Sequence, residues 1–310
     1  MDRLTVVIAV LTYQRPGDLR QALPRLVDQA ASSPLQASVL VIDNDPRGSA
    51  RAIFEGFPAP MLRYVNETRP GISAARNRAL AEAHDCDLLV FIDDDEVPVD
   101  NWLNLLTGQY LASGAAAVAG PVLSEYARKP SEFIDRGEFF KRRRMASGTK
   151  LTVAATNNLL LDLRSIRLLG LTFDERFGLS GGSDTLFTRR LVSLGGSMVW
   201  CDEAVVIDKV PESRLTTGWV LRRALRSGNS WARVGLEMAT GPLQAAAARA
   251  RLAVLGGGRL VVGLGRSGLG VAMRDTRHRA KGLRTAARGA GMLSGACGYV
   301  YSEYRRKAST

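Results

Sequence analysis

Short apolar runs that stop at polar clusters alternate with segments of helical spacing through the first hundred residues. Four such runs predict strands of a sheet that is buried on both faces: residues 4–11, 38–42, 61–65 and 88–92. Apolar residues recur at helical intervals within residues 16–31, and residues 72–83 also predict a helix. Strands that alternate with helices in this way predict a parallel, right-handed doubly wound α/β sheet.

The remainder of the chain changes character twice. Residues 118–122 and 198–201 predict two further strands, and the polar, basic stretch 126–150 predicts a surface loop or flap. Beyond Pro211 the pattern becomes helical, with one helix expected over residues 219–239.

The net charge of +12 on 310 residues is concentrated at one end. Residues 209–310 hold 19 Lys and Arg against 4 Asp and Glu, a balance of +15, so the preceding residues carry −3. A basic region attracts nucleic acid or anionic lipid. Long apolar and glycine-rich stretches favour lipid here, and we expect no nucleic-acid partner because interleaved aromatic residues and nucleic-acid motifs are missing.

Cysteine usage and the first residues bear on the cellular compartment. The cysteines, Cys86, Cys201 and Cys297, are widely spaced and form no CxxC pair, which argues against a disulfide framework or a zinc site and for a reducing compartment. The N-terminus runs directly into a predicted strand, so we expect no secretory signal.

Residues 252–273 are apolar but contain seven glycines and two arginines. A membrane span needs about 20 mainly apolar residues, and each central arginine costs roughly 2.5–3.5 kcal/mol, so peripheral attachment is favoured over a span. Four basic residues then recur at steps of four, three and four, on one face of a helix: Arg277, Lys281, Arg284 and Arg288. That face is either solvated or, beside the apolar segment, lies on anionic lipid.

Four consecutive acidic residues, Asp93, Asp94, Asp95 and Glu96, follow the apolar run 88–92. A buried strand delivers its next residues to the carboxyl edge of the sheet, where open α/β proteins bind ligands. Adjacent carboxylates repel one another unless a cation compensates them, and oxygen ligands of this kind suit Mg2+ or Mn2+ shared with substrate phosphates. A solvated acidic turn is the alternative.

Five ordered motifs carry a resemblance to a known family: TYQRP at 12–16, IDND at 42–45, PGISAARNRAL at 70–80, FIDDDEVP at 91–98 and GLSGGSDTLF at 178–187. Together they make residues 4–210 resemble the family 2 glycosyltransferases of the GT-A fold. WCDEAVV at 200–206 and RRALRSGNS at 222–230 resemble, more narrowly, bacterial exopolysaccharide glycosyltransferases of the succinoglycan type. The resemblance implies a Rossmann-like, mostly parallel sheet in a nucleotide-sugar transferase domain over residues 1–210. Residues 211–310 would form a basic, glycine-rich helical region that associates with membranes.

The resemblance also implies roles for the polar ends of the first two strands. Asp43 is placed as the carboxylate that accepts a hydrogen bond from the uracil ring of the donor. Arg76 is expected to pack beside the same base or its ribose, with an ordinary surface arginine as the alternative. Thr12 and Arg15 end the first strand and are expected to touch the nucleotide.

In the acidic tetrad, the resemblance implies that Asp93 contacts the ribose and that Asp95 binds the metal, while Asp94 is ambiguous. The metal, Mn2+ or Mg2+, would neutralise charge on the departing diphosphate. Asp208 is a possible further metal ligand at a place where many relatives have a His, and Lys209 could reach the diphosphate. Asn157 is expected against the sugar or acceptor, and an internal hydrogen bond is an equal alternative.

Asp184 keeps the position of the family's general base, which removes the proton of the acceptor hydroxyl. Most relatives have an acidic pair here, whereas this chain has Ser183 before Asp184. Gly181 and Gly182 would let the backbone pass close to the donor sugar. An N-cap of the following helix is the alternative for Asp184.

The resemblance therefore implies an inverting, metal-dependent transferase that moves a sugar from a nucleotide-sugar donor, expected to be a UDP-sugar. The acceptor would be a hydroxyl of a lipid-linked oligosaccharide or polysaccharide in exopolysaccharide or cell-envelope glycan synthesis. We expect a peripheral protein at the cytoplasmic face of the inner membrane, held to anionic lipid by its C-terminal region. The alternative is a catalytically degenerate GT-A fold that serves as a membrane-docked binding partner.

Overall fold

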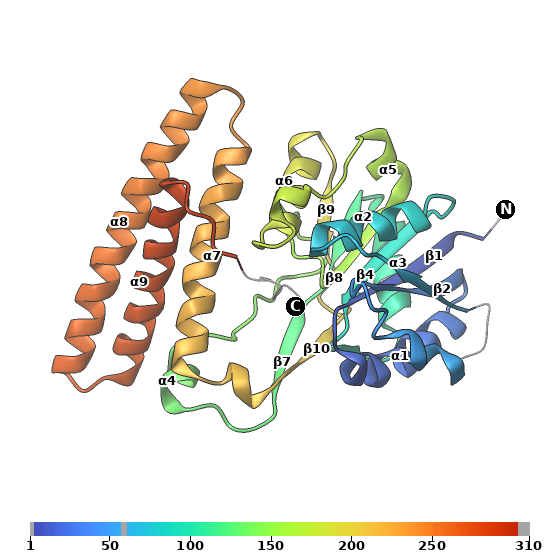
Figure 1. Cartoon of the computed structure of the whole chain (residues 1–310), viewed down its shortest axis with the longest axis horizontal. Coiled ribbons are helices and arrows are strands. Elements are labelled where there is room, and N and C mark those ends of the chain that lie inside the picture. The colour runs from blue at the N-terminus through green and yellow to red at the C-terminus, as the bar shows by residue number, and fades with distance from the viewer. Residues whose placement is uncertain (1–2, 57–60, 303–310) are drawn as a thin grey trace. The chain divides into compact units, whose positions relative to one another are not determined.

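The computed structural model describes residues 3–56 and 61–302, and within these residues the chain forms two sheets flanked by helices (Figure 1). The strands are β1 (Thr5–Thr12), β2 (Gln36–Asp43), β3 (Leu62–Asn66), β4 (Leu88–Asp93), β5 (Glu96–Pro98), β6 (Ala117–Ala119), β7 (Val122–Tyr126), β8 (Asn158–Asp162), β9 (Met198–Trp200) and β10 (Val206–Val210). The α-helices are α1 (Pro16–Ala31), α2 (Ile72–Glu82), α3 (Trp102–Ser113), α4 (Glu132–Arg136), α5 (Leu163–Leu168), α6 (Ser183–Ser193), α7 (Thr217–Glu237), α8 (Pro242–Ala272) and α9 (Thr276–Ala296). The short 3-10 helices are η1 (Arg51–Gly56), η2 (Glu175–Phe177) and η3 (Glu212–Arg214).

The larger sheet has the strand order β3-β2-β1-β4-β8-β6-β9. Strands β1 to β4 are parallel to one another, β8 is antiparallel to both of its neighbours, and β9 is parallel to β6. The predicted α/β fold with a mostly parallel sheet is therefore confirmed, including the helical C-terminal region.

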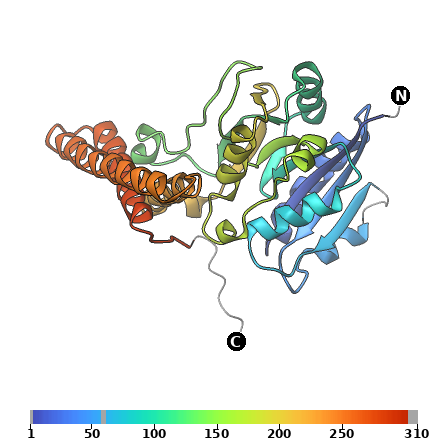
Figure 2. The same ribbon diagram turned by 90° about the horizontal axis from the view of Figure 1, so that it is seen from above.

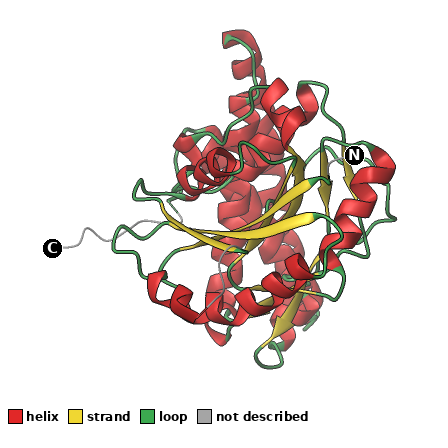
Figure 3. Cartoon of the chain, turned by 90° about the vertical axis from the view of Figure 1, so that its right-hand side faces the viewer, coloured by secondary structure: helices red, strands yellow, loops and turns green. Residues whose placement is uncertain are grey.

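Both faces of this sheet are buried, which explains why its strands read as continuous apolar runs. In β1, Val6, Ile8 and Val10 join the core beneath α1 and α3, because successive side chains of a strand point to opposite faces. The residues between them, such as Val7 and Ala9, join the core beneath α2, α5 and α6. Figure 3 shows helices on both faces of the sheet.

The strand predicted over residues 118–122 is in fact two strands in two different sheets. It breaks at Gly120–Pro121, because proline lacks the N–H that a continuing ladder needs. A Cβ at Gly120 would also collide with the Ala204 carbonyl oxygen and the Asn158 side chain. After the break, β7 enters a small sheet of order β5-β10-β7.

The stretch 126–150, predicted as a surface loop, contains α4 and contributes to a core of its own. Ile134 and Phe140 are buried together with Val220 of α7. Phe140 also stacks on Trp219, with ring centroids 5.9 Å apart and an interplanar angle of 8°. The prediction of a loop was wrong here because the many basic residues of this stretch outnumber the few apolar residues that form the core.

The chain divides into two compact units. Unit 1 contains residues 1–123, 142–178 and 183–208, and unit 2 contains residues 124–141, 179–182 and 209–310. Unit 1 holds the larger sheet. In unit 2, the long helices α7, α8 and α9 pack against one another, and α8 is antiparallel to α9 (Figure 2).

The glycines of α8 explain how α8 and α9 pack so closely. Gly256, Gly263 and Gly270 recur every seven residues and face α9, where a Cβ at any of them would lie within 3.0 Å of backbone atoms. Gly282 and Gly289 of α9, also seven residues apart, pack against the backbone of α8 in the same interface. Glycines of residues 252–273 therefore serve the close packing of α8 against α9.

No helix within the described residues is both long enough and apolar enough to cross a membrane. The four basic residues predicted to share one face of α9 are used differently from one another. Lys281 lies 3.0 Å from the Glu138 carboxylate, and Arg284 donates to the carbonyl oxygens of Gly137 and Glu138 at 3.2 and 2.8 Å. Only Arg277 and Arg288 of that set are exposed.

Candidate active site

Parallel strands bring three of the predicted site residues to one edge of the larger sheet. In the register of β1 with its neighbours, Thr12 lies beside Asp43 and Leu11 lies beside Asp93. Each residue stands at or next to the carboxyl end of its strand, so the three polar strand ends converge, as expected for a ligand site in an α/β protein.

The acidic tetrad alternates in burial along the chain. Asp93 and Asp95 are partly exposed, whereas Asp94 and Glu96 are 4% and 1% exposed. Glu96 accepts hydrogen bonds from the Asp93 N–H at 3.2 Å and from Asn157 Nδ2 at 2.6 Å. Burial raises the pKa of Glu96 well above its ordinary value, and the charge of Asp93 adds to the shift.

Asp94 ties the end of β1 to the tetrad. Its carboxylate accepts hydrogen bonds from the Thr12 hydroxyl at 2.7 Å and from Arg15 at 3.3 Å. Burial raises the pKa of Asp94 to about 7, although both partners oppose the shift. Thr12 is itself buried and directs its hydroxyl to Asp94. In this structure Thr12 therefore supports the tetrad from within.

Arg15 also supplies positive charge to the partly exposed carboxylate of Asp95, at 3.0 Å. Loss of solvent raises the pKa of Asp93 to about 6, and Asp95 adds to the shift; Arg76 opposes it and Asp184 raises it further. Asp95 and Asp184 thus add negative charge near Asp93, and Arg76 adds positive charge.

A divalent cation at these carboxylates would share its coordination between protein oxygens and ligands from the substrate and water. Within residues 3–56 and 61–302, no three His, Cys, Asp or Glu side chains are grouped so as to hold a metal ion. Asp93 and Asp95 nevertheless offer hard carboxylate oxygens whose like charge a cation would relieve. Mg2+ and Mn2+ sites of this kind take their remaining ligands from substrate phosphates and water.

Asp208 lies on β10 directly opposite Glu96, so the structure brings it to the same region as the tetrad. Its carboxylate accepts a hydrogen bond from Arg142 at 3.3 Å. The Asn157 side-chain amide donates an internal hydrogen bond to Glu96 of the tetrad. Its expected contact with the sugar or acceptor stays a prediction.

Arg76 is buried at the carboxylate cluster. It is 9% exposed, donates to the Ser183 hydroxyl at 2.6 Å and lies 5.4 Å from the centre of the Phe173 ring. Ser183 is neutral, so the guanidinium charge is left to act on Asp93. The structure thus places the positive charge of Arg76 near Asp93, and its expected contact with the base or ribose stays a prediction.

Asp184 is the second residue of α6 and is partly exposed. Its Oδ1 accepts a hydrogen bond from the Thr185 N–H at 2.7 Å, which leaves the other carboxylate oxygen for a further contact. Just before it, Gly181 and Gly182, which group with unit 2, have φ angles of 77° and 94° that favour glycine. Within unit 2, Arg233 of α7 donates to the Ser180 hydroxyl of the same loop.

Asp43 has a structural task that the sequence did not reveal. Its carboxylate is fully buried and accepts hydrogen bonds from the Asp45 N–H at 3.0 Å, the Ala50 N–H at 2.9 Å and the Tyr64 hydroxyl at 3.0 Å. Burial and then Asp43 raise the pKa of Tyr64 to about 12. Because the side chain is fully buried, contact between Asp43 and a base would require its neighbours to move.

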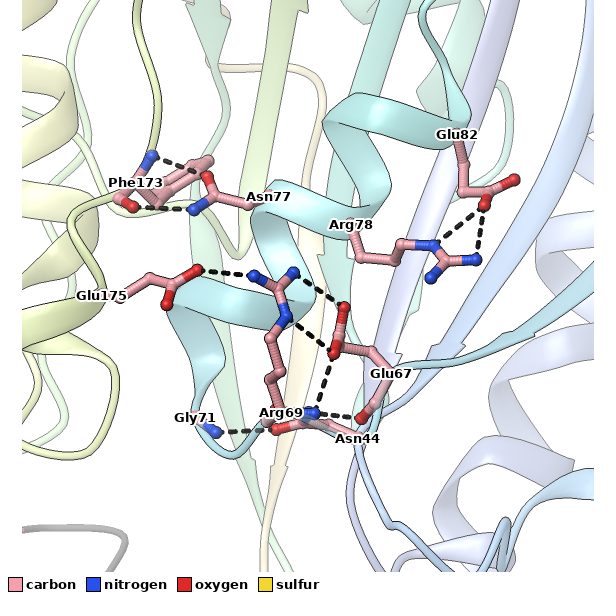
Figure 4. A network of polar contacts seen from close by, with 9 residues as sticks. All are labelled: Asn44, Glu67, Arg69, Gly71, Asn77, Arg78, Glu82, Phe173 and Glu175. Carbon is pink, nitrogen blue, oxygen red and sulfur yellow. Dashed lines mark hydrogen bonds and ion pairs between the residues drawn. The ribbon is translucent and has the colours of Figure 1, made fainter.

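Asn44 is the main residue that sequence reasoning missed (Figure 4). Its amide donates to the carbonyl oxygens of Glu67 and Arg69 at 2.8 and 2.7 Å, and its Oδ1 accepts from the Gly71 N–H at 3.0 Å. Asn44 thereby holds the segment that leads into α2, the helix that carries Arg76. The only signal in the sequence was its place within IDND.

A second amide in Figure 4 connects α2 to the segment before α6. Asn77 donates to the Phe173 carbonyl oxygen and accepts from the Phe173 N–H, both at 2.8 Å. Gly71 has a φ of 112°, and a Cβ there would lie 3.0 Å from the Gly178 carbonyl carbon. Because α2 and the segment 173–178 are joined in this way, Arg76 and Ser183 meet in a defined position.

Comparison with known proteins is consistent with this geometry. The family model "Glycosyl transferase family 2" matches residues 7–163. The succinoglycan biosynthesis protein ExoM of Rhizobium meliloti (strain 1021) is 35% identical over 247 residues, which cover 79% of each chain.

Solved structures share the fold at low identity. The mannosyltransferase PcManGT from Pyrobaculum calidifontis, in complex with GDP-Man and Mn2+, has a TM-score of 0.57 at 17% identity, with 94% of this chain and 87% of that chain covered. GalNAc-T7 with UDP, GalNAc and Mn2+ has a TM-score of 0.55 at 12% identity; 75% of this chain is covered, but it spans only 47% of that longer chain. From the family match and the related sequence we conclude that the chain belongs to glycosyl transferase family 2 and is a glycosyltransferase.

Proposed function

We propose that this enzyme is an inverting, divalent-metal-dependent transferase that uses a nucleoside diphosphate sugar, with a UDP-sugar as the expected donor. The observation that carries the proposal is the convergence of Thr12, Asp43 and Asp93 at the carboxyl edge of the sheet, where Arg15 pairs with Asp94 and Asp95. The two solved relatives with bound nucleotide and Mn2+ support a metal-dependent donor site in this fold.

The proposed donor site is built from side chains of unit 1. Asp95 would hold the cation, with Asp208 as a further candidate, and Asp93 would contact the ribose. A bound cation would neutralise the diphosphate as it departs. Arg15 now compensates Asp95 and is partly exposed. It is therefore placed to turn toward a diphosphate once a cation takes over that compensation. Arg76 would keep Asp93 ionised by its positive charge.

The proposed chemistry is a direct displacement at the anomeric carbon. Asp184 accepts the proton of the acceptor hydroxyl as the hydroxyl oxygen forms its bond to that carbon. The bond between the anomeric carbon and the diphosphate oxygen breaks, and its electron pair leaves with the nucleoside diphosphate. One base and no covalent nucleophile are required, which gives inversion of configuration.

We propose a lipid-linked oligosaccharide or a polysaccharide as the acceptor, in bacterial exopolysaccharide or cell-envelope glycan synthesis. The relationship to a protein named for succinoglycan biosynthesis supports this class of product. The basic C-terminal region supports an anionic membrane surface as the place of work, and we propose peripheral attachment at the cytoplasmic face of the inner membrane.

Calorimetry tests the donor site. UDP and, separately, GDP are titrated into the full-length protein with Mn2+ or with EDTA. We expect one nucleotide to bind tightly in Mn2+ and weakly in EDTA, because Asp95 would otherwise face the diphosphate as a like charge. Asp95→Asn should abolish this metal dependence. The control Asp85→Asn changes a carboxylate that is 85% exposed and precedes the N-terminal end of β4, so it should retain the metal dependence.

Equal affinity in Mn2+ and in EDTA would remove the metal from the proposal. A screen of activated sugars that scores released nucleoside diphosphate would then identify the donor. If no activated sugar yields nucleoside diphosphate in the presence of the membrane fraction, the transferase assignment itself is contradicted.

A further inference from the structure

The side of α8 that points away from α9 exposes large aliphatic side chains along most of its length. We define its outer face by Val254, Val261, Val262, Leu264, Leu269 and Val271, which are 74, 70, 67, 54, 51 and 61% exposed. Scattered apolar residues on a surface need no explanation, but a contiguous apolar face marks an interaction site.

The glycine pattern fixes which side of α8 faces outward. Gly256, Gly263 and Gly270 are buried against α9. A Cβ added at Gly258 or Gly265 would meet nothing within 4 Å. Since one side of the helix is committed to α9, the opposite side cannot turn inward without loss of the close packing between the two helices.

Charge around the outer face identifies the partner. Residues 242–274 contain no Asp or Glu, and their charged side chains are the exposed arginines Arg249, Arg251, Arg259, Arg266 and Arg274. Of these, Arg259 directs one guanidinium N–H to Met292 Sδ of α9. A second copy of α8 would bring like charges together, whereas anionic headgroups would complement them. An apolar helix face with basic residues at its margins is the pattern of a helix that lies in the plane of a membrane interface.

We infer that α8 lies in the headgroup region of an anionic bilayer, with its outer face toward the acyl chains and its arginines at the phosphates. This inference rests on the membrane attachment put forward above and assigns it to α8. It moves the contact away from α9, where Lys281 and Arg284 are engaged by residues 137 and 138.

Vesicle co-sedimentation of the full-length protein tests the assignment. The vesicles are equal parts phosphatidylglycerol and phosphatidylcholine, compared with phosphatidylcholine alone. The combined substitutions Val254→Gln, Val261→Gln and Leu264→Gln should lower partitioning onto the anionic vesicles by at least about tenfold, because the apolar contact is lost. Matched changes in unit 1, Leu111→Gln with Leu168→Gln, remove side chains that are 62 and 78% exposed and should leave partitioning unchanged.

Each outcome separates one hypothesis from another. If the unmodified protein ignores both kinds of vesicle, membrane attachment itself is wrong. If it binds and the α8 variant binds equally well, attachment stands and the assignment to α8 is overturned. If the α8 substitutions instead dissolve a concentration-dependent dimer seen without vesicles, a second copy covers this face and the inference is also overturned. Retained nucleotide binding by calorimetry shows that unit 1 of the variant is folded and that the donor site is independent of the result. An unchanged helical signal in circular dichroism shows that the helices of unit 2 are intact.

Discussion

Two glycines of α8, only two residues apart, should respond to alanine in opposite ways. A Cβ at Gly263 would lie 2.4 Å from the Ala286 backbone nitrogen and 2.7 Å from the Gly282 carbonyl oxygen, whereas a Cβ at Gly265 meets nothing within 4 Å. Alanine favours a helix over glycine by about 0.8–1.0 kcal/mol at either position. The difference between the two variants therefore isolates the cost of separating α8 from α9.

That cost follows from the distances. Non-bonded atoms approach comfortably only to about 3.5 Å, so α8 and α9 would have to move apart by roughly 1 Å along a seam of glycines. Overpacking of this kind costs about 1–3 kcal/mol, and backbone atoms on both sides place Gly263 at the upper end. After the gain in helix propensity, Gly263→Ala should destabilise the protein by about 2 kcal/mol, while Gly265→Ala should stabilise it by about 1 kcal/mol.

Thermal unfolding followed by circular dichroism checks both variants in lipid-free buffer. With about 2–4 °C per kcal/mol for a chain of this size, the midpoint should fall by about 4–8 °C for Gly263→Ala and rise by about 2–4 °C for Gly265→Ala. Equal shifts in the same direction would refute the close packing of α8 on α9, and with it the assignment of the outer face.

Two further predictions concern the site. Asp184→Asn keeps the size of the side chain and the acceptor for the Thr185 N–H but cannot take a proton, so turnover should fall about 10²–10⁴-fold while nucleotide binding in Mn2+ stays unchanged; near-normal turnover in a rate assay would exclude Asp184 as the base. Asn44→Ala leaves the carbonyl oxygens of Glu67 and Arg69 and the Gly71 N–H without this partner and should lower the free energy of unfolding by about 2–4 kcal/mol. A urea midpoint unchanged by Asn44→Ala would show that the loop is held by other contacts.

The local sequence determined the first four strands and the first two helices of unit 1, and the place where the polar residues gather. It did not predict α3, α5, β5 or β8. Strands buried on both faces must be continuously apolar, and parallel strands must end at a common edge, so the runs that precede Thr12, Asp43 and Asp93 were sufficient to predict their convergence. Spacing likewise predicted α1 and α7 to within about two residues of their ends.

Tertiary structure decided what each polar side chain does at that edge. Arg76 bonds to Ser183, which is 107 residues away in the chain, and Lys281 pairs with Glu138 across 143 residues. Asp43 accepts hydrogen bonds from donors in the loop after β2 and from Tyr64 of β3. A charged or amide group uses its hydrogen-bonding capacity on whichever neighbours folding brings within reach, and a pattern of adjacent residues does not contain that information. For the same reason, the seven glycines of residues 252–273 became interpretable only when α9 showed which of them are packed and which face outward.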